Sequence, residues 1–385
     1  MVPKEWKIKT IGDIATVSSG GTPNRKEQAY WNGDIPWVTT AEVQFKTILD
    51  SAEKITKEGL TNSSAKLFPI NTILMAMYGQ GKTRGQVAKL GIEASTNQAC
   101  AAIILSSDYC VDYYYQFLIY QYENIRNMSN SGSQENLSGS IVKSIPVLVP
   151  PYFEQEKIAQ ILSTWDQAIS TTEKMLQNSQ QQKKALMQQL LTGKKRLLDE
   201  NGVKFSDEWQ RIELVLLLDY QQPTPYLVES TAYSDSYETP VLTAGKTFIL
   251  GYTNESSGIY QDELPVIIFD DFTTDSKYVN FPFKAKSSAM KILTAKKGVS
   301  IKFVFEAMQM LQFTVGGHQR HWISIFSNLV IPLPNKKEQQ QIAEVLSLAD
   351  QEIETLQKKL DCLQQEKKAL MQQLLTGKKR VKVAA

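Results

Sequence analysis

Residues 183–196 read KKALMQQLLTGKKR, and the same stretch recurs without change at residues 367–380, an offset of 184 positions. A weaker similarity, offset by 203, relates the residues around Trp6 to those around Trp209. An internal repeat of this length indicates two copies of one structural plan. Each copy has an aromatic start, a variable body and a repeated segment at its end.

Both repeated segments are predicted to belong to long helices. Mostly apolar residues alternate at four- and three-residue steps over residues 158–190 and again over 342–374. An average spacing of 3.5 residues is typical of a coiled-coil seam. Prolines precede both segments, and Gly193 and Gly377 follow them, as expected at helix ends. Each helix should run for roughly 38 residues, or about 57 Å at 1.5 Å per residue.

The two seams could pair in either of two ways. They could form a coiled coil between two molecules, or they could pair with one another, antiparallel, within one chain. We favour the second, because each seam is joined to its own globular body. The seam lysines Lys183 and Lys367 are expected to snorkel near the ends of the paired helices and to help fix their register. The expected shape is a dumbbell with a pseudo-two-fold axis, which suits a DNA duplex.

The two bodies lack helical periodicity over most of their length. Short apolar runs between turn residues predict strands, at residues 72–78, 101–105, 266–269 and 300–305. A helix is expected at 112–126. We therefore predict an α+β fold with two globular domains separated by an antiparallel two-helix coiled coil. The boundaries are 1–153 (body 1), 154–203 (first helix and linker), 204–334 (body 2) and 335–385 (second helix and tail).

Composition narrows the class of protein. Hydrophobic residues make up 42% and charged residues 21%, as in ordinary soluble domains. No apolar run is long enough to span a membrane, and the start of the chain lacks an apolar signal core, so a cytoplasmic protein is expected. Three cysteines without paired spacing fit reduced thiols better than disulfides or zinc.

Charge is nearly balanced in both bodies. Body 1 holds 14 basic and 13 acidic residues, and body 2 holds 11 and 14. A free-standing DNA-binding protein usually has a stronger basic surface. This charge by itself neither demands nor excludes a nucleic-acid partner, because local patches decide binding.

Residues 76–83 read AMYGQGKT, a relaxed form of the phosphate-binding loop of nucleotide hydrolases. That loop runs from a strand directly into a helix, which Gly85 would break in its first turn. Nucleotide hydrolysis is therefore not expected. Two interpretations remain: an ordinary hairpin turn, or a Gly-rich loop that presents Tyr78, Gln80, Lys82 and Arg84 to DNA.

Residues 149–152 read VPPY, which is similar to the Pro-Pro-Tyr motif of adenine methyltransferases. That motif needs Asn or Asp before the prolines to bind the target amino group, and Val149 cannot do so. No Gly-rich loop for S-adenosylmethionine precedes it. The prolines are better interpreted as the end of a strand and the start of a helix.

His318 and His321 are the only histidines, and two glycines just before them favour a loop over a helical metal site. No cysteine or carboxylate cluster accompanies them. The segment is either a plain surface loop or a DNA contact, with Gln319 and Arg320 as natural donors. We favour the second, because residues 131–134 occupy the matching place before the first helix.

Several stretches resemble the target-recognition domains of type I restriction–modification specificity subunits. Residues 20–23 (GGTP) and 30–38 (YWNGDIPWV) resemble the opening of such a domain. Residues 95–100 (STNQAC) and 132–137 (GSQENL) resemble later elements. The most specific stretch is 186–193 (LMQQLLTG), which resembles the end of the spacer helix and occurs twice. Body 2 keeps the same plan but lacks the GGTP stretch.

The resemblance implies a non-catalytic subunit that reads a bipartite sequence in double-stranded DNA. It implies a complex with two methyltransferase (M) subunits, with restriction (R) subunits added for cleavage, and no membrane partner. This chain itself would bind no cofactor or metal. S-adenosylmethionine, ATP and magnesium would belong to the partner subunits.

The side chains expected to contact DNA lie in loops of both bodies, and no catalytic residue is expected. They are Tyr78, Gln80, Lys82, Thr83, Arg84, Asn97, Gln98, Ser133, Gln134, Asn136, Lys246, His318, Gln319 and Arg320.

Two other functions stay open: a coiled-coil scaffold with two binding heads and no role on DNA, and a stand-alone methyltransferase, which the missing motifs disfavour. An adjacent methyltransferase gene, or co-purification with a methyltransferase, would discriminate between them.

Overall fold

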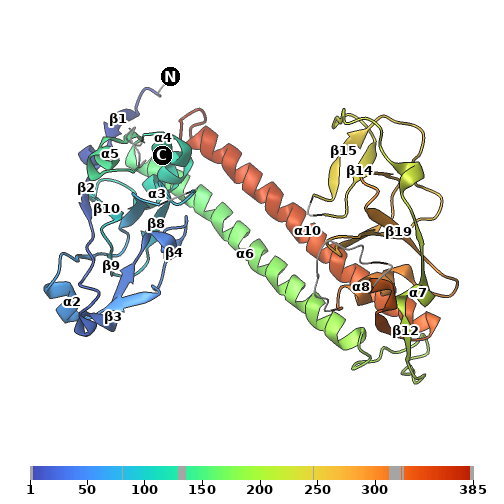
Figure 1. Ribbon diagram of the computed structural model, residues 1–385. Helices are drawn as coiled ribbons and strands as arrows, with labels where there is room; N and C mark the ends of the chain where they lie inside the picture. The colour runs from blue at the N-terminus through green and yellow to red at the C-terminus, as the bar shows by residue number, and fades with distance from the viewer. Residues whose placement is uncertain are drawn as a thin grey trace. The chain divides into compact units, whose positions relative to one another are not determined.

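The structure is a computed structural model, and it describes residues 3–79, 81–128, 136–245, 247–311, 322 and 325–381. The chain divides into two compact units, Met1–Glu173 with Lys359–Ala385, and Lys174–Lys358. Each unit therefore contains one body and part of each long helix (Figure 1). Mixed sheets and helices in both units confirm the predicted α+β composition.

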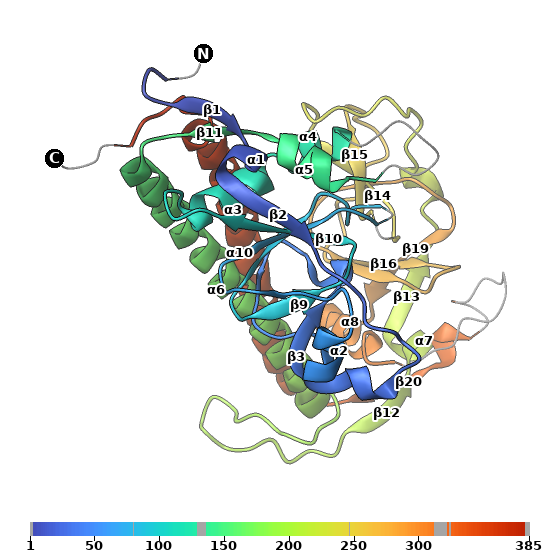
Figure 2. The ribbon, with the colours of Figure 1, turned by 90° about the vertical axis from the view of Figure 1, so that its left-hand side faces the viewer.

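Body 1 is built on two mixed sheets and a small two-stranded ladder. One sheet has the order β2-β10-β7-β8-β4, the other β5-β3-β9-β6, and β1 pairs with β11. Figure 2 shows β3 beside the short helix α2 (Lys57–Thr61). The strands are β1 (Lys7–Thr10), β2 (Ala15–Ser19), β3 (Trp31–Val38), β4 (Thr47–Ile48), β5 (Glu53–Ile55), β6 (Leu67–Phe68), β7 (Ile73–Ala76), β8 (Val87–Leu90), β9 (Ala94–Thr96), β10 (Cys100–Leu105) and β11 (Pro146–Val149).

The described residues of body 1 also form short helices between the strands. They are α1 (Ile11–Ile14), α2 (Lys57–Thr61), α3 (Val111–Tyr120), α4 (Tyr122–Asn127) and α5 (Gly139–Ser144). The helix predicted at 112–126 is confirmed as α3 and α4, which meet at Gln121.

Body 2 repeats the central sheet of body 1, with the order β13-β19-β16-β17. It adds a three-stranded sheet, β15-β14-β18, and the ladder β12-β20. Its strands are β12 (Gln210–Glu213), β13 (Leu218–Gln221), β14 (Thr239–Leu242), β15 (Ile249–Thr253), β16 (Val266–Asp270), β17 (Ser276–Val279), β18 (Lys284–Ala285), β19 (Met290–Ala295) and β20 (Val330–Leu333). Its helical elements are α7 (Leu214–Leu217), α8 (Ile301–Met308), η3 (Thr224–Tyr226) and η4 (Phe326–Asn328).

One strand prediction was wrong. Residues 300–305 were expected to form a strand, but the structure has helix α8 there. The Ser300 side chain accepts a hydrogen bond from the Phe303 amide and caps the helix. Lys302 and Glu306, four residues apart, form an ion pair at 2.7 Å. A short apolar run fits either structure by periodicity alone, and here the cap and the buried helix face decide it.

The two repeated segments form the long helices α6 (Tyr152–Leu190) and α10 (Lys336–Leu374), each of 39 residues. Their first residues follow Pro151 and Asn335, and the Asn335 side chain accepts from the Glu338 amide at 3.0 Å. Gly193 and Gly377 follow their ends with φ of 72° and 71°, a left-handed conformation that suits glycine. Both helix predictions are confirmed.

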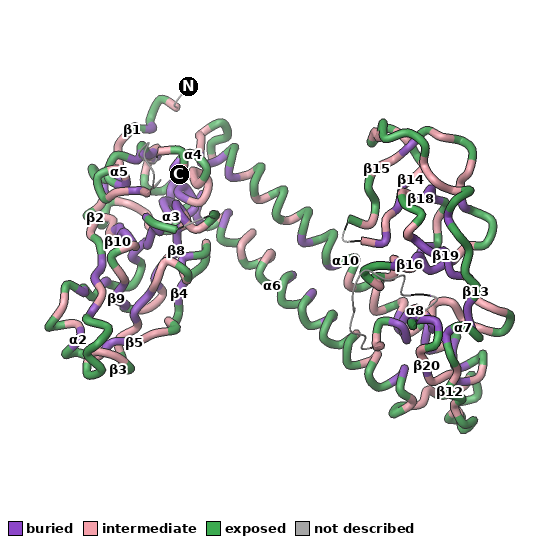
Figure 3. Tube along the Cα trace, viewed as in Figure 1, coloured by how far each residue is buried: buried purple, intermediate pink, exposed green. Residues whose placement is uncertain are grey.

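Within each unit, the end of one helix packs beside the start of the other. Met371, Leu374 and Leu375 share a buried core with Ile158 and Leu162 and with body 1. In the other unit, Leu190 and Leu191 share a core with Ile342, Leu346 and body 2. The helices therefore pair antiparallel within the chain, as predicted. Figure 3 shows the buried residues concentrated in the sheets and in the helix ends that pack against them.

The seam lysines do not snorkel as expected. Lys367 pairs with Asp166 at 2.6 Å, and Lys183 pairs with Asp350 at 2.6 Å. Both lysine side chains are mostly buried, 12% and 17% exposed. A carboxylate on the opposite helix compensates each ammonium group in place, so neither needs to reach bulk water.

The two ion pairs are equivalent in the sequence repeat, since the offset of 184 relates Lys183 to Lys367 and Asp166 to Asp350. The helix starts show the same duplication. Glu154 accepts bonds from the Trp6 indole and from Arg380. Glu338 accepts the equivalent bonds from the Trp209 indole and from Arg196. The chain thus has two structural copies of one junction.

The hydrogen bonds at these junctions also shift arginine ionisation. Bonds to Glu154 raise the pKa of Arg380, and bonds to Glu338 raise the pKa of Arg196. Both guanidinium groups therefore stay charged, and each holds the end of one helix against the start of the other.

Candidate nucleic-acid interface

Three loops that carry candidate DNA contacts converge in body 1. Strands β7 and β8 form a hairpin whose loop spans residues 77–86. The Met77 amide donates to the Ala99 carbonyl at 2.8 Å, and the Leu137 amide donates to the Met77 carbonyl at 2.9 Å. These two bonds bring together the segments that carry Tyr78, Gln98 and Asn136.

A groove of about 500 Å³ opens between these loops, the end of β2 and the start of α5. Its polar lining includes Ser18, Ser19, Tyr78, Gln98, Ser140 and Lys143. Lys66 reaches the rim, where its ammonium group donates to the Ser18 hydroxyl at 2.8 Å. Hydroxyl, amide and ammonium groups of this kind supply most protein contacts to DNA phosphates and base edges.

The described candidates differ in how far they reach the surface. Tyr78 is 41% exposed, and Lys82 and Gln98 are exposed. Thr83, Asn97 and Asn136 are half-buried. The Asn97 carboxamide accepts from the Ala99 amide at 3.1 Å, so it helps shape its own turn. Arg84 is only 8% exposed, so the loop does not present it to solvent.

The loop at residues 77–86 is held from helix α4. The Tyr122 hydroxyl donates to the Lys82 carbonyl, and Arg126 donates to the Gly81 carbonyl at 2.8 Å. Gly85 has a φ of 83°, and a Cβ there would lie 3.0 Å from the Arg126 side chain. Residues 81–85 are therefore held against α4, and the Lys82 side chain stays exposed.

Strand β8, not a helix, follows this loop. A phosphate-binding loop needs the N-terminus of a helix at this point, so the motif does not form a nucleotide site. The expectation against nucleotide hydrolysis agrees with this geometry. Likewise, Pro150 and Pro151 lie between the end of β11 and the start of α6, as interpreted from the sequence.

Seven of the candidate residues lie outside the described part of the chain. They are Gln80, Ser133, Gln134, Lys246, His318, Gln319 and Arg320.

Body 2 has a second groove, of about 400 Å³, beside β13, the strand of its sheet that corresponds to β2 in body 1. It opens between β13 and η4, and its lining includes Asp219, Tyr220, Lys296, Trp322 and Asn328. Lys296 and Asp219 lie 3.5 Å apart. Sequence reasoning missed these residues, as it missed Ser18, Ser19, Ser140 and Lys143. The only indication in the sequence was that β2 and β13, which border the grooves, each follow shortly after the aromatic start of their copy.

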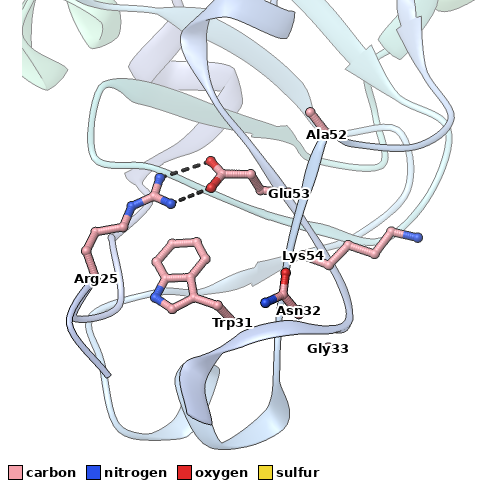
Figure 4. A pocket seen from close by; sticks show the side chains of 7 residues that line it. All are labelled: Arg25, Trp31, Asn32, Gly33, Ala52, Glu53 and Lys54. Carbon is pink, nitrogen blue, oxygen red and sulfur yellow. Dashed lines mark hydrogen bonds and ion pairs between the residues drawn. The ribbon is translucent and has the colours of Figure 1, made fainter. Parts of the chain in front are cut away.

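A separate pocket of about 390 Å³ lies at the far sheet of body 1 (Figure 4). Arg25 lies 3.9 Å from the centre of the Trp31 ring and forms a two-pronged ion pair with Glu53. The bond to Glu53 raises the pKa of Arg25, and the same bond lowers the pKa of Glu53. Glu53 compensates Arg25, and Asp50 lies 3.3 Å from the ammonium group of Lys54, so we interpret this pocket as part of the folded loop rather than as a ligand site.

Two further observations concern the described residues as a whole. None of the described helices is long and apolar enough to cross a membrane. Within the same ranges, no three His, Cys, Asp or Glu side chains gather as metal ligands. Cys100, Cys110 and Cys362 are free thiols, and burial raises the pKa of Cys100 to about 12.

Comparison with known proteins places these features in a family. Residues 3–179 and 207–365 each match the model of the type I restriction modification DNA specificity domain. The specificity subunit of the type I restriction enzyme EcoR124I/EcoR124II of Escherichia coli is 53% identical over 132 residues. That match covers 33% of this chain and 32% of the relative, so it spans about a third of the relative's length.

A longer match extends over nearly the whole chain. The putative MjaX specificity subunit of Methanocaldococcus jannaschii is 24% identical, with 99% of this chain and 95% of that protein covered. Among solved structures, the S subunit of a type I restriction–modification system from M. genitalium has a TM-score of 0.70 at 15% identity. It covers 97% of this chain and 96% of its own, which shows a shared fold. The chain therefore belongs to the family of type I restriction modification DNA specificity domains and carries two copies of that domain.

Proposed function

We propose that this chain is the DNA-reading subunit of a type I restriction–modification complex and that each body reads one half of a bipartite target. The observation that carries the proposal is the duplication itself. Each of the two specificity domains carries a groove beside the corresponding strand of its sheet, β2 or β13, and the linings of these grooves differ in sequence. A duplicated reader with unlike surfaces suits a target made of two unlike half-sites.

The proposal includes partner subunits. Two methyltransferase subunits would modify adenine, and restriction subunits would cleave DNA. S-adenosylmethionine, ATP and magnesium would be bound by those partners. The near balance of charge in both bodies supports this division, because tight DNA binding by one chain alone would call for more cationic side chains. We also propose that the complex acts in the cytoplasm.

In this proposal the chain is divided by role. Body 1 and body 2 recognise DNA, and α6 and α10 set the spacing between the half-sites. The proposed boundaries are 1–153, 154–203, 204–334 and 335–385.

Gel-shift titration at fixed salt tests the function. Specific duplex should bind tightly to the chain assembled with its methyltransferase subunits, and only weakly or without sequence preference to the chain alone. Lys143→Gln, in the groove of body 1, should weaken specific binding by about tenfold. Lys358→Gln is the matched control, because Lys358 lies exposed on α10 outside both grooves. Nanomolar specific binding by the isolated chain would refute the proposed dependence on partners.

The scaffold alternative makes a different prediction. A coiled-coil scaffold with two protein-binding heads would show no sequence preference for DNA under any of these conditions. The specificity-domain match over both bodies favours the DNA reader.

A further inference from the structure

We propose that the buried ion pair between Asp271 and Lys291 is a positioning device that sets the reading surface of body 2. The inference rests on the proposed function, and it concerns two residues that do not themselves line the groove. Both side chains are 0% exposed. Burying two charges removes them from water, which costs free energy, so the presence of this pair needs an explanation.

The pair joins four segments of body 2. The Lys291 ammonium group, on β19, lies 3.1 Å from one Asp271 oxygen and donates to the Gln222 carboxamide at 3.0 Å. The other Asp271 oxygen accepts from the Trp322 backbone amide at 3.0 Å. Asp271 begins the loop between β16 and β17, and Gln222 directly follows β13. Trp322 lies in the stretch that leads to η4.

Body 1 has the same backbone frame without these charges. The Asp271 amide donates to the Ala289 carbonyl at 3.1 Å, and the Met77 amide donates to the Ala99 carbonyl at 2.8 Å. The strand registers pair Asp270 with Met290 and Ala76 with Cys100. One residue further along, Asp271 therefore corresponds to Met77, and Lys291 corresponds to Ala101.

The link to the segment that carries Trp322 in body 2, and Leu137 in body 1, also differs. In body 1 a backbone bond makes it, from the Leu137 amide to the Met77 carbonyl at 2.9 Å. In body 2 a side-chain oxygen makes it, and Lys291 fixes the direction in which that oxygen points. The fold itself can thus be built with a neutral pair at this site, as body 1 demonstrates.

Stability does not account for the charged pair. Replacing a buried ion pair by well-packed apolar groups is often neutral or stabilising. What the pair adds is a fixed relation between two surface segments. One is the β16–β17 loop, with Phe272 45% exposed, and the other is the end of β13, with Tyr220 46% exposed. Tyr220 also lines the groove of body 2. Aromatic and polar groups at such positions can discriminate bases only when their spacing is fixed.

The test gives body 2 the neutral residues that body 1 has at this site, Met77 and Ala101. The double variant Asp271→Met/Lys291→Ala is assembled with the methyltransferase subunits. Methylation is then measured on DNA in which each position of each half-site is varied in turn. The double variant should keep cooperative unfolding and full discrimination at the first half-site. Discrimination at the second half-site should fall at least tenfold.

A second variant guards against misfolding. Asp271→Glu keeps the charge but moves the carboxylate by one methylene, so it should fold and still loosen the second half-site. The matched control is Glu255→Gln/Lys284→Met, which removes another poorly exposed ion pair of body 2, at 2.7 Å. Neither residue lines the groove, so discrimination should stay unchanged.

Three results would overturn the inference. Unchanged discrimination in both Asp271 variants would reduce the pair to a structural feature. Equal loss at both half-sites, or an equal effect of the control, would indicate general destabilisation. Failure of the unaltered complex to methylate any defined sequence would overturn the proposed function and this inference together.

Discussion

One added heptad in each long helix should widen the gap between the two half-sites of the DNA target. The insertions are placed next to Leu176 in α6 and next to Leu360 in α10, which lie at equivalent points of the repeat. The ion pair of Asp166 with Lys367 belongs to one compact unit, and that of Lys183 with Asp350 belongs to the other. Each ion pair therefore lies wholly on one side of the two insertions and can still form. A whole heptad also keeps the 3.5-residue repeat of the seam in phase.

The magnitude follows from helix geometry. Seven residues at 1.5 Å each lengthen each helix by about 10.5 Å. Duplex DNA rises about 3.4 Å per base pair, so the gap should grow by about three base pairs while both half-sites keep their sequences. Three base pairs also rotate the duplex by about 100°, given 10–10.5 base pairs per turn. A heptad shifts the helix face by only about 20°. The rate of methylation is therefore expected to fall as the gap lengthens.

Methylome sequencing of a strain that carries the double insertion, with its partner subunits, reads out the gap directly. The control has the heptad in α6 alone, which puts the seams out of step and should abolish specific methylation. An active enzyme with an unaltered gap would show that these helices do not set the spacing. A changed half-site sequence would show that they do more than space the bodies.

Further predictions concern the loop of body 1 and the helix pairing. Arg126→Met removes the bond to the Gly81 carbonyl, so discrimination at the first half-site should fall several-fold on substrates with single mismatches, while the second half-site is unaffected. Asp350→Asn removes a carboxylate that pairs with both Lys183 and Lys302, while Glu306 still pairs with each of them, and should lower the free energy of unfolding by about 1–2 kcal/mol in urea titrations because Asp350 is 37% exposed. Asp166→Asn should cost less, about 1 kcal/mol, because its carboxylate bonds one lysine and is 42% exposed; equal losses would show that the number of lysine partners does not set the cost. Burial raises the pKa of Asp350, but bonds from Lys183 and a second lysine outweigh this and hold the pKa below its ordinary value. Its stabilising effect should therefore be complete above about pH 4 and lost as the pH falls through the lowered pKa, so the difference between Asp350→Asn and the unaltered chain should shrink in acid melts.

Long-range periodicity made the helices predictable. Each seam extends over about five heptads and ends at a glycine, so its length and boundaries could be inferred from the amino-acid pattern. The antiparallel partner within the chain was favoured over a second molecule because each seam is joined to its own body. What the pattern could not show is how Lys183 and Lys367 are accommodated. Their carboxylate partners lie 167 and 201 positions away, and only the register of the pairing brings them into contact.

Short segments were harder to predict. The run at residues 300–305 fits a strand and a helix equally well until the cap at Ser300 and the Lys302–Glu306 pair are taken into account. For the candidate site, Tyr78, Gln98 and Asn136 were identified from their loops, and the structure brings those loops together. Lys143 was not identified, because a lone lysine on a short helix has no distinguishing pattern. Arg84 was expected at the surface, but its side chain is buried.

Each body is proposed to read its own half-site, and exchange of one body is the sharpest test of that division. Residues 204–334 are replaced by the equivalent body of a related specificity subunit, and the chimera is expressed with the original methyltransferase subunits. Methylome sequencing should then show a new second half-site beside an unchanged first half-site and an unchanged gap. If both halves of the methylated sequence change, or if neither does, independent reading by two bodies is contradicted.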